Sequence, residues 1–239
     1  MCQNFAVHAG TRVNFMGFAT TINGGDVGGT SVTGPHQFED GGGLVDDSGA
    51  FGADVSAAHG EAMAVRNDGI AMVGGIGGMT FTPGIYRSSG AVIVTLGTVV
   101  TLDGLNETNP VFLFQCYSTL DTGANSAVVL KNGATAENVL WALGTTGTLG
   151  ANSVLVGSII AGTAITFGLR SELRGCALAE TTVTFDSEGS IGLTHSVDGA
   201  ENTEARWIRH LRGSKRQTQF VKRASKRAMR YNNEDNGTQ

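Results

Sequence analysis

Threonine and asparagine residues recur three positions apart in this chain, and their types and spacing point to a function. Each pair lies in a stretch rich in β-branched residues and glycine. The pairs are Thr98/Thr101, Thr122/Asn125, Thr11/Asn14, Thr30/Thr33 and the weaker Ser187/Ser190. Because threonine is stiff about χ1, a row of such residues holds its methyl and hydroxyl groups in fixed positions. Such a row can order a layer of water, or the threonines reflect only their preference for strands.

The spacing sets a condition on the backbone. On an ideal strand, residues i and i+3 point to opposite faces. The two members of a pair therefore share a face only if a corner or a bulge lies between them. Glycines beside three of the pairs permit such a corner, but the pattern breaks at Ala151/Val154, which has no hydroxyl, and at Leu169/Glu172, which carries a charge.

The ionisable residues do not form the clusters that catalysis requires. Acid/base chemistry on a polysaccharide needs two carboxylates close together, whereas the carboxylates here are scattered along the sequence. They include Asp46, Asp47, Asp103 and Asp121, and the basic residues Arg87 and Lys131 stand alone. The sequence favours a protein that is not an enzyme and that uses no cofactor and no metal.

The three cysteines, Cys2, Cys116 and Cys176, leave two interpretations open. Their odd number and their spacing fit no metal-binding motif. They are predicted to be small buried hydrophobic residues, or two of them form a disulfide, which only geometry can decide.

Short stretches with a common outline recur along the chain and predict how the threonine pairs are positioned. They start at Thr95, Thr119, Thr148, Thr166 and Thr184, with spacings of 24, 29, 18 and 18 residues. A drifting period of about 20 residues, built from strands and glycine turns, is typical of stacked coils. The 36 glycines and only 3 prolines suit many turns with positive φ. We therefore predict a mainly β fold, a β-solenoid.

One helix is predicted beside the coils, over residues 48–68. Ser48 is its candidate N-cap, and small apolar residues from Val55 to Ala62 follow helical spacing. His59 on this helix has no partner that the sequence identifies, so we predict a surface or packing residue.

Other segments have a simpler interpretation. The apolar runs 111–115, 139–143 and 157–161 predict fully buried strands. The glycines within residues 35–47 could hold a phosphate, but no strand-then-helix pattern with a lysine follows them, so we predict a plain loop.

The chain changes character near residue 196. From residue 200 onward ten Lys/Arg stand against four Asp/Glu, so this part carries +6, whereas residues 1–199 carry −11. We predict a domain over 3–196 and a basic tail over 197–239, which is either solvated and disordered or helical and attached to an anionic partner. The acidic body argues against nucleic-acid binding, and no apolar run is long enough to span a bilayer.

Several short motifs, in the same order, resemble the DUF3494 family of ice-binding (antifreeze) proteins, which occurs in polar diatoms, fungi and bacteria. Each motif alone is weak, but the combination is specific and covers residues 3–193. The motifs are Asn4-Phe5-Ala6-Val7 with Ala9-Gly10, Thr82-Pro83-Gly84-Ile85-Tyr86, Pro110-Val111-Phe112-Leu113-Phe114-Gln115, Val139-Leu140-Trp141, Leu149-Gly150-Ala151-Asn152-Ser153 with Val156-Gly157-Ser158-Ile159, and Val183-Thr184-Phe185.

The resemblance implies an irregular right-handed β-solenoid of triangular cross-section, with one long α-helix alongside and the N-terminal segment at the far end of the stack. It also implies binding to an ice crystal surface, thermal hysteresis and inhibition of ice recrystallisation. The family motif Thr-Ala/Gly-X-Thr/Asn is matched fully by Thr122-Gly123-Ala124-Asn125. The five pairs named at the outset are therefore the predicted ice-binding residues. Activity is expected to be moderate, because two coils break the pattern.

The chain shows no signal peptide, and we interpret it as a mature, secreted protein. We also expect it to be a monomer. Two other functions stay open. One is an extracellular adhesion or matrix protein attached through the tail, and the N-glycosylation patterns at Asn106-Glu107-Thr108 and Asn236-Gly237-Thr238 are compatible with it. The other is a polysaccharide-acting β-helix enzyme, for which fold analogy is the only support.

Overall fold

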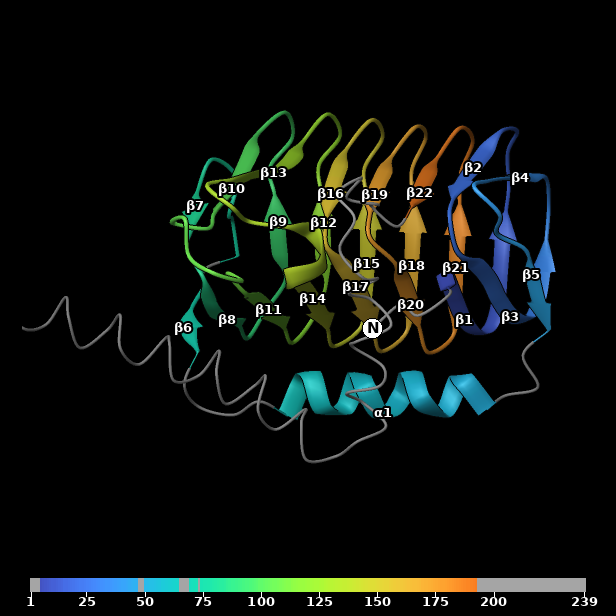
Figure 1. Ribbon diagram of the computed structural model, residues 1–239, viewed down its shortest axis with the longest axis horizontal. Coiled ribbons are helices and arrows are strands. Elements are labelled where there is room, and N and C mark those ends of the chain that lie inside the picture. Colours follow the sequence, from blue (N-terminus) through green and yellow to red (C-terminus); the bar gives the residue numbers. More distant parts are fainter. Residues whose placement is uncertain (1–4, 47–49, 65–68, 73, 193–239) are drawn as a thin grey trace, which may run out of the picture.

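A stack of coils makes up the part of the chain that the computed structural model describes, residues 5–46, 50–64, 69–72 and 74–192. It contains twenty-two strands, one α-helix and one 3₁₀ turn, η1 (Ala136–Asn138). The strands pair in parallel and form one fourteen-stranded and one eight-stranded sheet (Figure 1). The prediction of a mainly β fold built from stacked coils is confirmed.

A full coil contributes three strands, and equivalent strands stack into three columns. The first column holds β6 (Ile70–Ala71), β8 (Gly84–Ser88), β11 (Phe112–Cys116), β14 (Val139–Leu143), β17 (Ser158–Ala161), β20 (Ala177–Ala179), the first halves of β1 (Phe5–Phe15) and β3 (Asp26–Thr33), and β5 (Leu44–Asp46). The second holds β9 (Val92–Val94), β12 (Leu120–Thr122), β15 (Thr146–Leu149), β18 (Ala164–Phe167), β21 (Thr182–Phe185) and the second halves of β1 and β3. The third holds β7 (Thr80–Phe81), β10 (Val99–Asp103), β13 (Ala127–Lys131), β16 (Val154–Val156), β19 (Glu172–Arg174), β22 (Ser190–Gly192), β2 (Thr20–Asn23) and β4 (His36–Glu39).

The order of the coils differs from the order of the chain. β22, the last described strand, pairs with β2, and the two halves of β1 pair with β20 and β21. The N-terminal coils therefore extend the stack beyond its C-terminal coil. From there α1 (Ala50–Ala64) runs back beside the first column toward the end where β6 lies (Figure 1). The position of the N-terminal segment agrees with what the resemblance implies.

The core fills the space between the three columns. Alternate strand residues point inward, as Val92 and Val94 do on either side of the exposed Ile93. Aromatic rings stack along the axis, and Phe114 lies 5.3 Å from Tyr86 and 4.1 Å from Trp141 between ring centroids. Such stacked side chains hold neighbouring coils in register.

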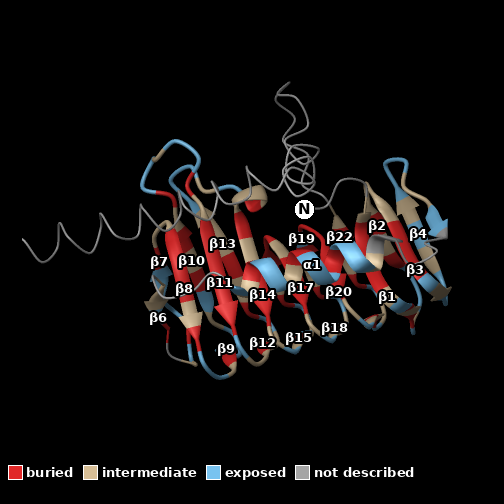
Figure 2. Ribbon diagram, turned by 90° about the horizontal axis from the view of Figure 1, so that it is seen from below, coloured by how far each residue is buried: buried red, intermediate tan, exposed pale blue. Residues whose placement is uncertain are grey.

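The helix packs small residues against the first column. Val55, Ala58 and Ala62 are buried there together with Ile160 and Leu178, so α1 lies close over the strands (Figure 2). The structure describes this helix over Ala50–Ala64, within the predicted 48–68. The candidate cap Ser48 and residues 65–68 lie outside the described residues. At 15 residues α1 is short, and the described part of the chain has no helix long and apolar enough to cross a membrane.

Polar contacts fix the position of α1. His59 Nδ1 lies 3.0 Å from Glu180 Oε1, and its Nε2 lies 2.8 Å from the carbonyl oxygen of Leu143. Gln115 Nε2 donates to the carbonyl oxygen of Ala62 at 2.6 Å. His59 is thus a packing residue whose partners, in β14 and directly after β20, the sequence could not identify.

The predicted buried strands are confirmed as β11, β14 and β17, each displaced by no more than one residue. The prediction of a loop over 35–47 is wrong, because this segment contains β4 and β5. Both strands pair with the preceding coil, so the segment forms the last turns of the stack.

Candidate functional site

The outer surface of the second column carries rows of threonine. We call this surface the threonine face: the exposed corner residues and outward residues of β15, β18, β21 and the second halves of β1 and β3. Its first row lies at the corner with the first column and is exposed to solvent throughout. This row is Thr145, Thr163, Thr181, Thr11 and Thr30. Backbone bonds of 2.8–2.9 Å connect the first four residues in that order.

Two further rows lie within the strands, where the register sets side chains of successive coils side by side. The second row is Thr146, Ala164, Thr182, Arg12 and Ser31, and the third is Thr148, Thr166, Thr184, Asn14 and Thr33. Neighbouring strands lie about 4.8 Å apart, so each row repeats its side chains at about that distance.

Five segments with the same outline therefore build the face. They are Thr145-Thr146-Gly147-Thr148, Thr163-Ala164-Ile165-Thr166, Thr181-Thr182-Val183-Thr184, Thr11-Arg12-Val13-Asn14 and Thr30-Ser31-Val32-Thr33. Thr145, Thr163 and Thr181 each lie at the corner, one residue before their strand begins. In the pair of β1 with β3, the register shifts between Ala9 and Arg12. These corners and bulges let residues i and i+3 share one face.

Buried rings support the face from inside. Phe185 lies 4.2 Å from Phe167 and 5.0 Å from Phe15 between ring centroids, and all three are buried. On the outer side, Thr33 Oγ1 donates to Asn14 Oδ1 at 3.0 Å. Close packing below and β-branched side chains above give the hydroxyl array little freedom to move.

Two ionisable residues interrupt this surface. Arg12 is exposed in the second row, between Thr182 and Ser31. Asp121 on β12 is in register with Thr148 and continues the third row toward the half-exposed Ile93. The uncharged part of the face thus runs through β15, β18 and β21.

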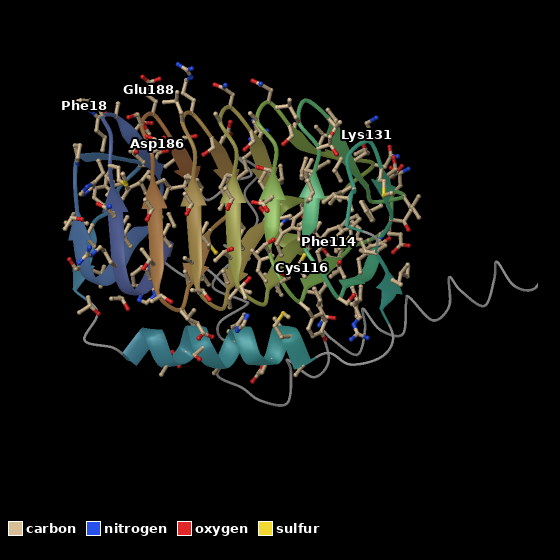
Figure 3. All side chains as sticks on the ribbon, turned by 180° about the vertical axis from the view of Figure 1, so that it is seen from behind. Phe18, Phe114, Cys116, Lys131, Asp186 and Glu188 are labelled. Atoms are coloured by element: carbon tan, nitrogen blue, oxygen red, sulfur yellow. The ribbon has the colours of Figure 1, made fainter. Side chains whose placement is uncertain are left out.

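A ladder of polar side chains lines the opposite edge of the face, where the second column turns into the third. Asn152 Nδ2 donates to Asn125 Oδ1 at 3.3 Å, and Arg170 Nε donates to Asn152 Oδ1 at 2.9 Å. Arg170 also reaches Glu188, with Nη1 3.5 Å from Oε2. Figure 3 shows Phe18, Asp186 and Glu188 along this edge. Asn125, Asn152, Arg170 and Glu188 all have φ between 53° and 57°, so these four turns each place a left-handed residue in the ladder.

Four of the predicted site residues, Thr11, Asn14, Thr30 and Thr33, lie on the threonine face. The other pairs do not join them. Thr98 lies in the turn before β10, where its Oγ1 donates to the carbonyl oxygen of Thr95 at 2.6 Å. Thr101 lies in β10 of the third column, in register with Val129 and Thr80.

The remaining predicted residues lie inside the stack or on other surfaces. Thr122 is only 5% exposed, and its Oγ1 donates to Ser153 Oγ at 3.0 Å. Asn125 belongs to the turn ladder, Ser187 lies in the turn after β21, and Ser190 begins β22 in the third column. The structure therefore does not bring the five predicted pairs onto one face.

The sequence prediction missed the centre of the face, although a signal was available. The missed residues are Thr145, Thr148, Thr163, Thr166, Thr181 and Thr184. The repeats starting at Thr148, Thr166 and Thr184 were identified by their spacing of 18 residues. Each of these threonines forms a Thr-X-X-Thr segment with the threonine three residues before it, whereas the prediction considered only the residues that follow it.

Two of the scattered ionisable groups, Asp103 and Arg87, have structural partners. Asp103 Oδ1 accepts hydrogen bonds from the backbone N–H of Leu105 at 2.9 Å and from Asn132 at 2.8 Å, and these bonds lower the pKa of its carboxyl group. Arg87 Nη2 donates to the hydroxyl of Tyr117 at 3.1 Å. Within the described ranges, no group of three or more His, Cys, Asp or Glu could hold a metal ion.

Comparison with known proteins gives consistent results. The sequence model of the family described as Ice-binding-like matches residues 4–191. An ice-binding protein of Nostoc sp. (strain HG1) is 42% identical over 86 residues, which is 36% of this chain and 31% of that protein. One of Lentinula edodes is 39% identical over 87 residues, 36% of this chain and 29% of that protein. The match thus spans about a third of the length of these curated relatives.

Solved structures match over more of their length. The crystal structure of the ice-binding protein from the Antarctic ascomycete Antarctomyces psychrotrophicus has a TM-score of 0.73 and 32% identity, and the match covers 82% of this chain and 97% of that chain. An ice-binding protein from an Antarctic biological consortium has a TM-score of 0.72 and 33% identity, covering 80% and 88%.

Proposed function

This chain belongs to the Ice-binding-like family, and from that premise we propose that it binds ice through the threonine face. The observation that carries the proposal is the register of this face, in which five coils align Thr-X-X-Thr or Thr-X-X-Asn. The names of the relatives support ice as the ligand. The pairs Thr98/Thr101, Thr122/Asn125 and Ser187/Ser190 lie elsewhere and are not part of this proposed site.

The mechanism rests on preorganised water. Ice presents a periodic lattice of water molecules, and the face presents methyl and hydroxyl groups repeating at about 4.8 Å along each row. Threonine holds these groups in place because its χ1 is restricted. Water held in ice-like positions above them needs little further ordering when it joins the crystal, so little entropy is lost on binding.

The same mechanism predicts moderate activity. Adsorbed protein stops local crystal growth, which gives thermal hysteresis and inhibits recrystallisation. Arg12 and Asp121 hold hydration shells of their own, and these shells compete with ice-like water at two places on the array. The uncharged rows across β15, β18 and β21 are the proposed centre of contact.

The finer features of the fold belong to the proposal. The three columns would form the sides of a triangular cross-section, and the coils would wind right-handed, as crossover connections between parallel strands nearly always do. We propose a domain over 3–196 with a separate tail over 197–239. It acts outside the cell as a monomer, without catalysis, cofactor or nucleic acid.

Thermal hysteresis and ice-crystal shape, measured on wild type and two variants, test the function. Thr166→Tyr places a bulky ring at the centre of the face, and Thr101→Tyr places the same ring on the third column. We expect crystal shaping and hysteresis from wild type and Thr101→Tyr, and a several-fold loss for Thr166→Tyr with an unchanged circular dichroism spectrum. A folded wild type without hysteresis or crystal shaping would exclude ice binding.

A further inference from the structure

The cysteines differ in state. Cys176 is disulfide-bonded, whereas Cys116 is a free and buried thiol. Since the chain has three cysteines, Cys2 is the only partner within the chain that remains for Cys176. We infer that a disulfide between Cys2 and Cys176 joins the N-terminal coils to the C-terminal coil of the stack. Cys2 precedes Phe5, the first described residue.

The strand register brings Cys2 within reach. Val7 on β1 is paired with Ala177 on β20, the residue that directly follows Cys176. Five residues lead from Val7 back to Cys2, enough to span at most about 18 Å. A disulfide needs Cα atoms only about 4.4–6.8 Å apart, a separation well within this reach.

The side chain of Cys176 also points in the required direction. It is fully buried in the cluster that α1 forms with the first column, together with Val55, Ala58 and Leu178. The inward neighbour Ala177 belongs instead to the core of the solenoid. The sulfur of Cys176 therefore lies on the outer side of the first column, in the layer beneath the helix.

This position lies where the N-terminal coils join the C-terminal coil of the stack, a junction that we call the seam. Elsewhere in the stack from β8 to β22, consecutive coils are also consecutive in the chain. At the seam, β1 pairs with β20 and β21, and β2 with β22, although these strands come from opposite ends of the described chain. A chain end frays unless something holds it, and a disulfide at Cys176 would hold this one.

The seam also crosses the threonine face. Thr184 is paired with Asn14 across it, and Thr182 with Arg12. If β1 separated from β21, the third row would lose Asn14 and Thr33 and would end at Thr184. The cross-link thus keeps the two parts of the face in one register.

Formation of this disulfide is a two-electron oxidation. Two thiols give one S–S bond, two protons and two electrons, and a protein or small-molecule disulfide takes up the electrons and protons to become two thiols. The thiolate is the reacting species. Burial raises the pKa of the Cys116 thiol to about 12, so Cys116 stays protonated and does not compete.

Thiol counting on the full chain, unfolded without reductant, tests the inference. We expect one free thiol in wild type and two in Cys2→Ser, and a peptide containing both Cys2 and Cys176 in a non-reducing digest analysed by mass spectrometry. Three free thiols in wild type, or a disulfide-linked dimer on a non-reducing gel, would overturn it. Neither readout depends on ice, so the proposed function is tested separately.

Thermal unfolding and hydrogen exchange test what the cross-link does. Cys2→Ser should lower the Tm by about 5–10 °C and speed amide exchange in β1 more than in β14. Reduction of wild type should give the same changes, and reduction of Cys2→Ser should add nothing. An unchanged Tm and unchanged exchange in β1 would show that the bond, if present, does not hold the seam.

Discussion

The threonine face and the outer surface of the third column are made by the same coils, yet their outward residues differ. The third row of the threonine face keeps a hydroxyl or amide at five successive positions. The corresponding row of the third column is Val99, Ala127, Val154, Glu172, Ser190, Thr21 and Gln37. One surface repeats its chemistry and the other changes from apolar to charged to polar.

This difference distinguishes residues that the fold requires from residues that a function requires. Inward residues of both columns are apolar because they fill one core, as Ile165 and Leu173 do, so their regularity reports the fold. Outward residues need only be compatible with a strand. A repeated outward residue type therefore requires another explanation, and a periodic ligand such as ice supplies one.

Removing the support beneath the threonine face should have the largest effect. Phe185→Ala deletes the central ring of the stack with Phe15 and Phe167 and should lower the free energy of unfolding by about 3–5 kcal/mol. The loosened rows should also bind ice less well. Denaturant unfolding and hysteresis of the folded variant measure the two effects.

Phe114→Ala is the matched control. It removes the ring between Tyr86 and Trp141 in the first column, so it should cost a similar free energy of unfolding. Hysteresis per folded molecule should stay near that of wild type. If both variants lose hysteresis equally, global stability and not local support explains the loss.

Releasing the helix should have a smaller effect, limited to stability. His59→Ala removes the contacts to Glu180 and to the carbonyl oxygen of Leu143 and should lower the free energy of unfolding by about 1–3 kcal/mol. Because the helix covers the first column, ice binding should not change. A marked loss of hysteresis in a folded His59→Ala protein would mean that the helix side also contacts ice.

Completing the second row should raise activity modestly. Arg12→Thr replaces the exposed cation between Thr182 and Ser31 and removes its competing hydration shell. Arg174→Thr removes the same charge from the third column and serves as the control. Recrystallisation inhibition over a dilution series should improve only for Arg12→Thr, and equal improvement in both would point to net charge.

The turn ladder should matter least. Asn152→Gly removes the side-chain bonds to Asn125 and Arg170 but retains easy access to the φ of 55°. We expect a loss below about 1 kcal/mol in the free energy of unfolding and no change in hysteresis. A larger loss in chemical denaturation would show that the ladder, and not the strand pairing alone, fixes the register.

Local patterns were enough to predict the coils, the helix and the buried strands. The apolar composition of a run such as 139–143 is enough to predict that the strand is buried. The place of the N-terminal coils came from the resemblance, because no local pattern indicates which distant strands β1 pairs with. For the same reason the partners of His59 were not predictable.

Some predicted site residues lie off the threonine face because the prediction depended on a shift of one residue. Thr122-Gly123-Ala124-Asn125 matches the family motif in sequence, yet Asp121 takes the outward position in register with Thr148. Successive strand residues alternate between faces, so Thr122 points inward. The turns between strands differ in length, so the position of each corner, and with it the register of β12 on β15, cannot be predicted from the sequence.

Partition of the protein into a slowly growing ice crystal tests whether the threonine face is the surface that binds ice. The comparison is between Thr148→Lys/Thr184→Lys, on either side of Thr166 in the third row, and Val99→Lys/Ser190→Lys on the third column. Both double variants add the same charge. We expect wild type and Val99→Lys/Ser190→Lys to enter the ice and Thr148→Lys/Thr184→Lys to stay in the liquid. Entry of the folded threonine-face variant at the wild-type level would contradict it.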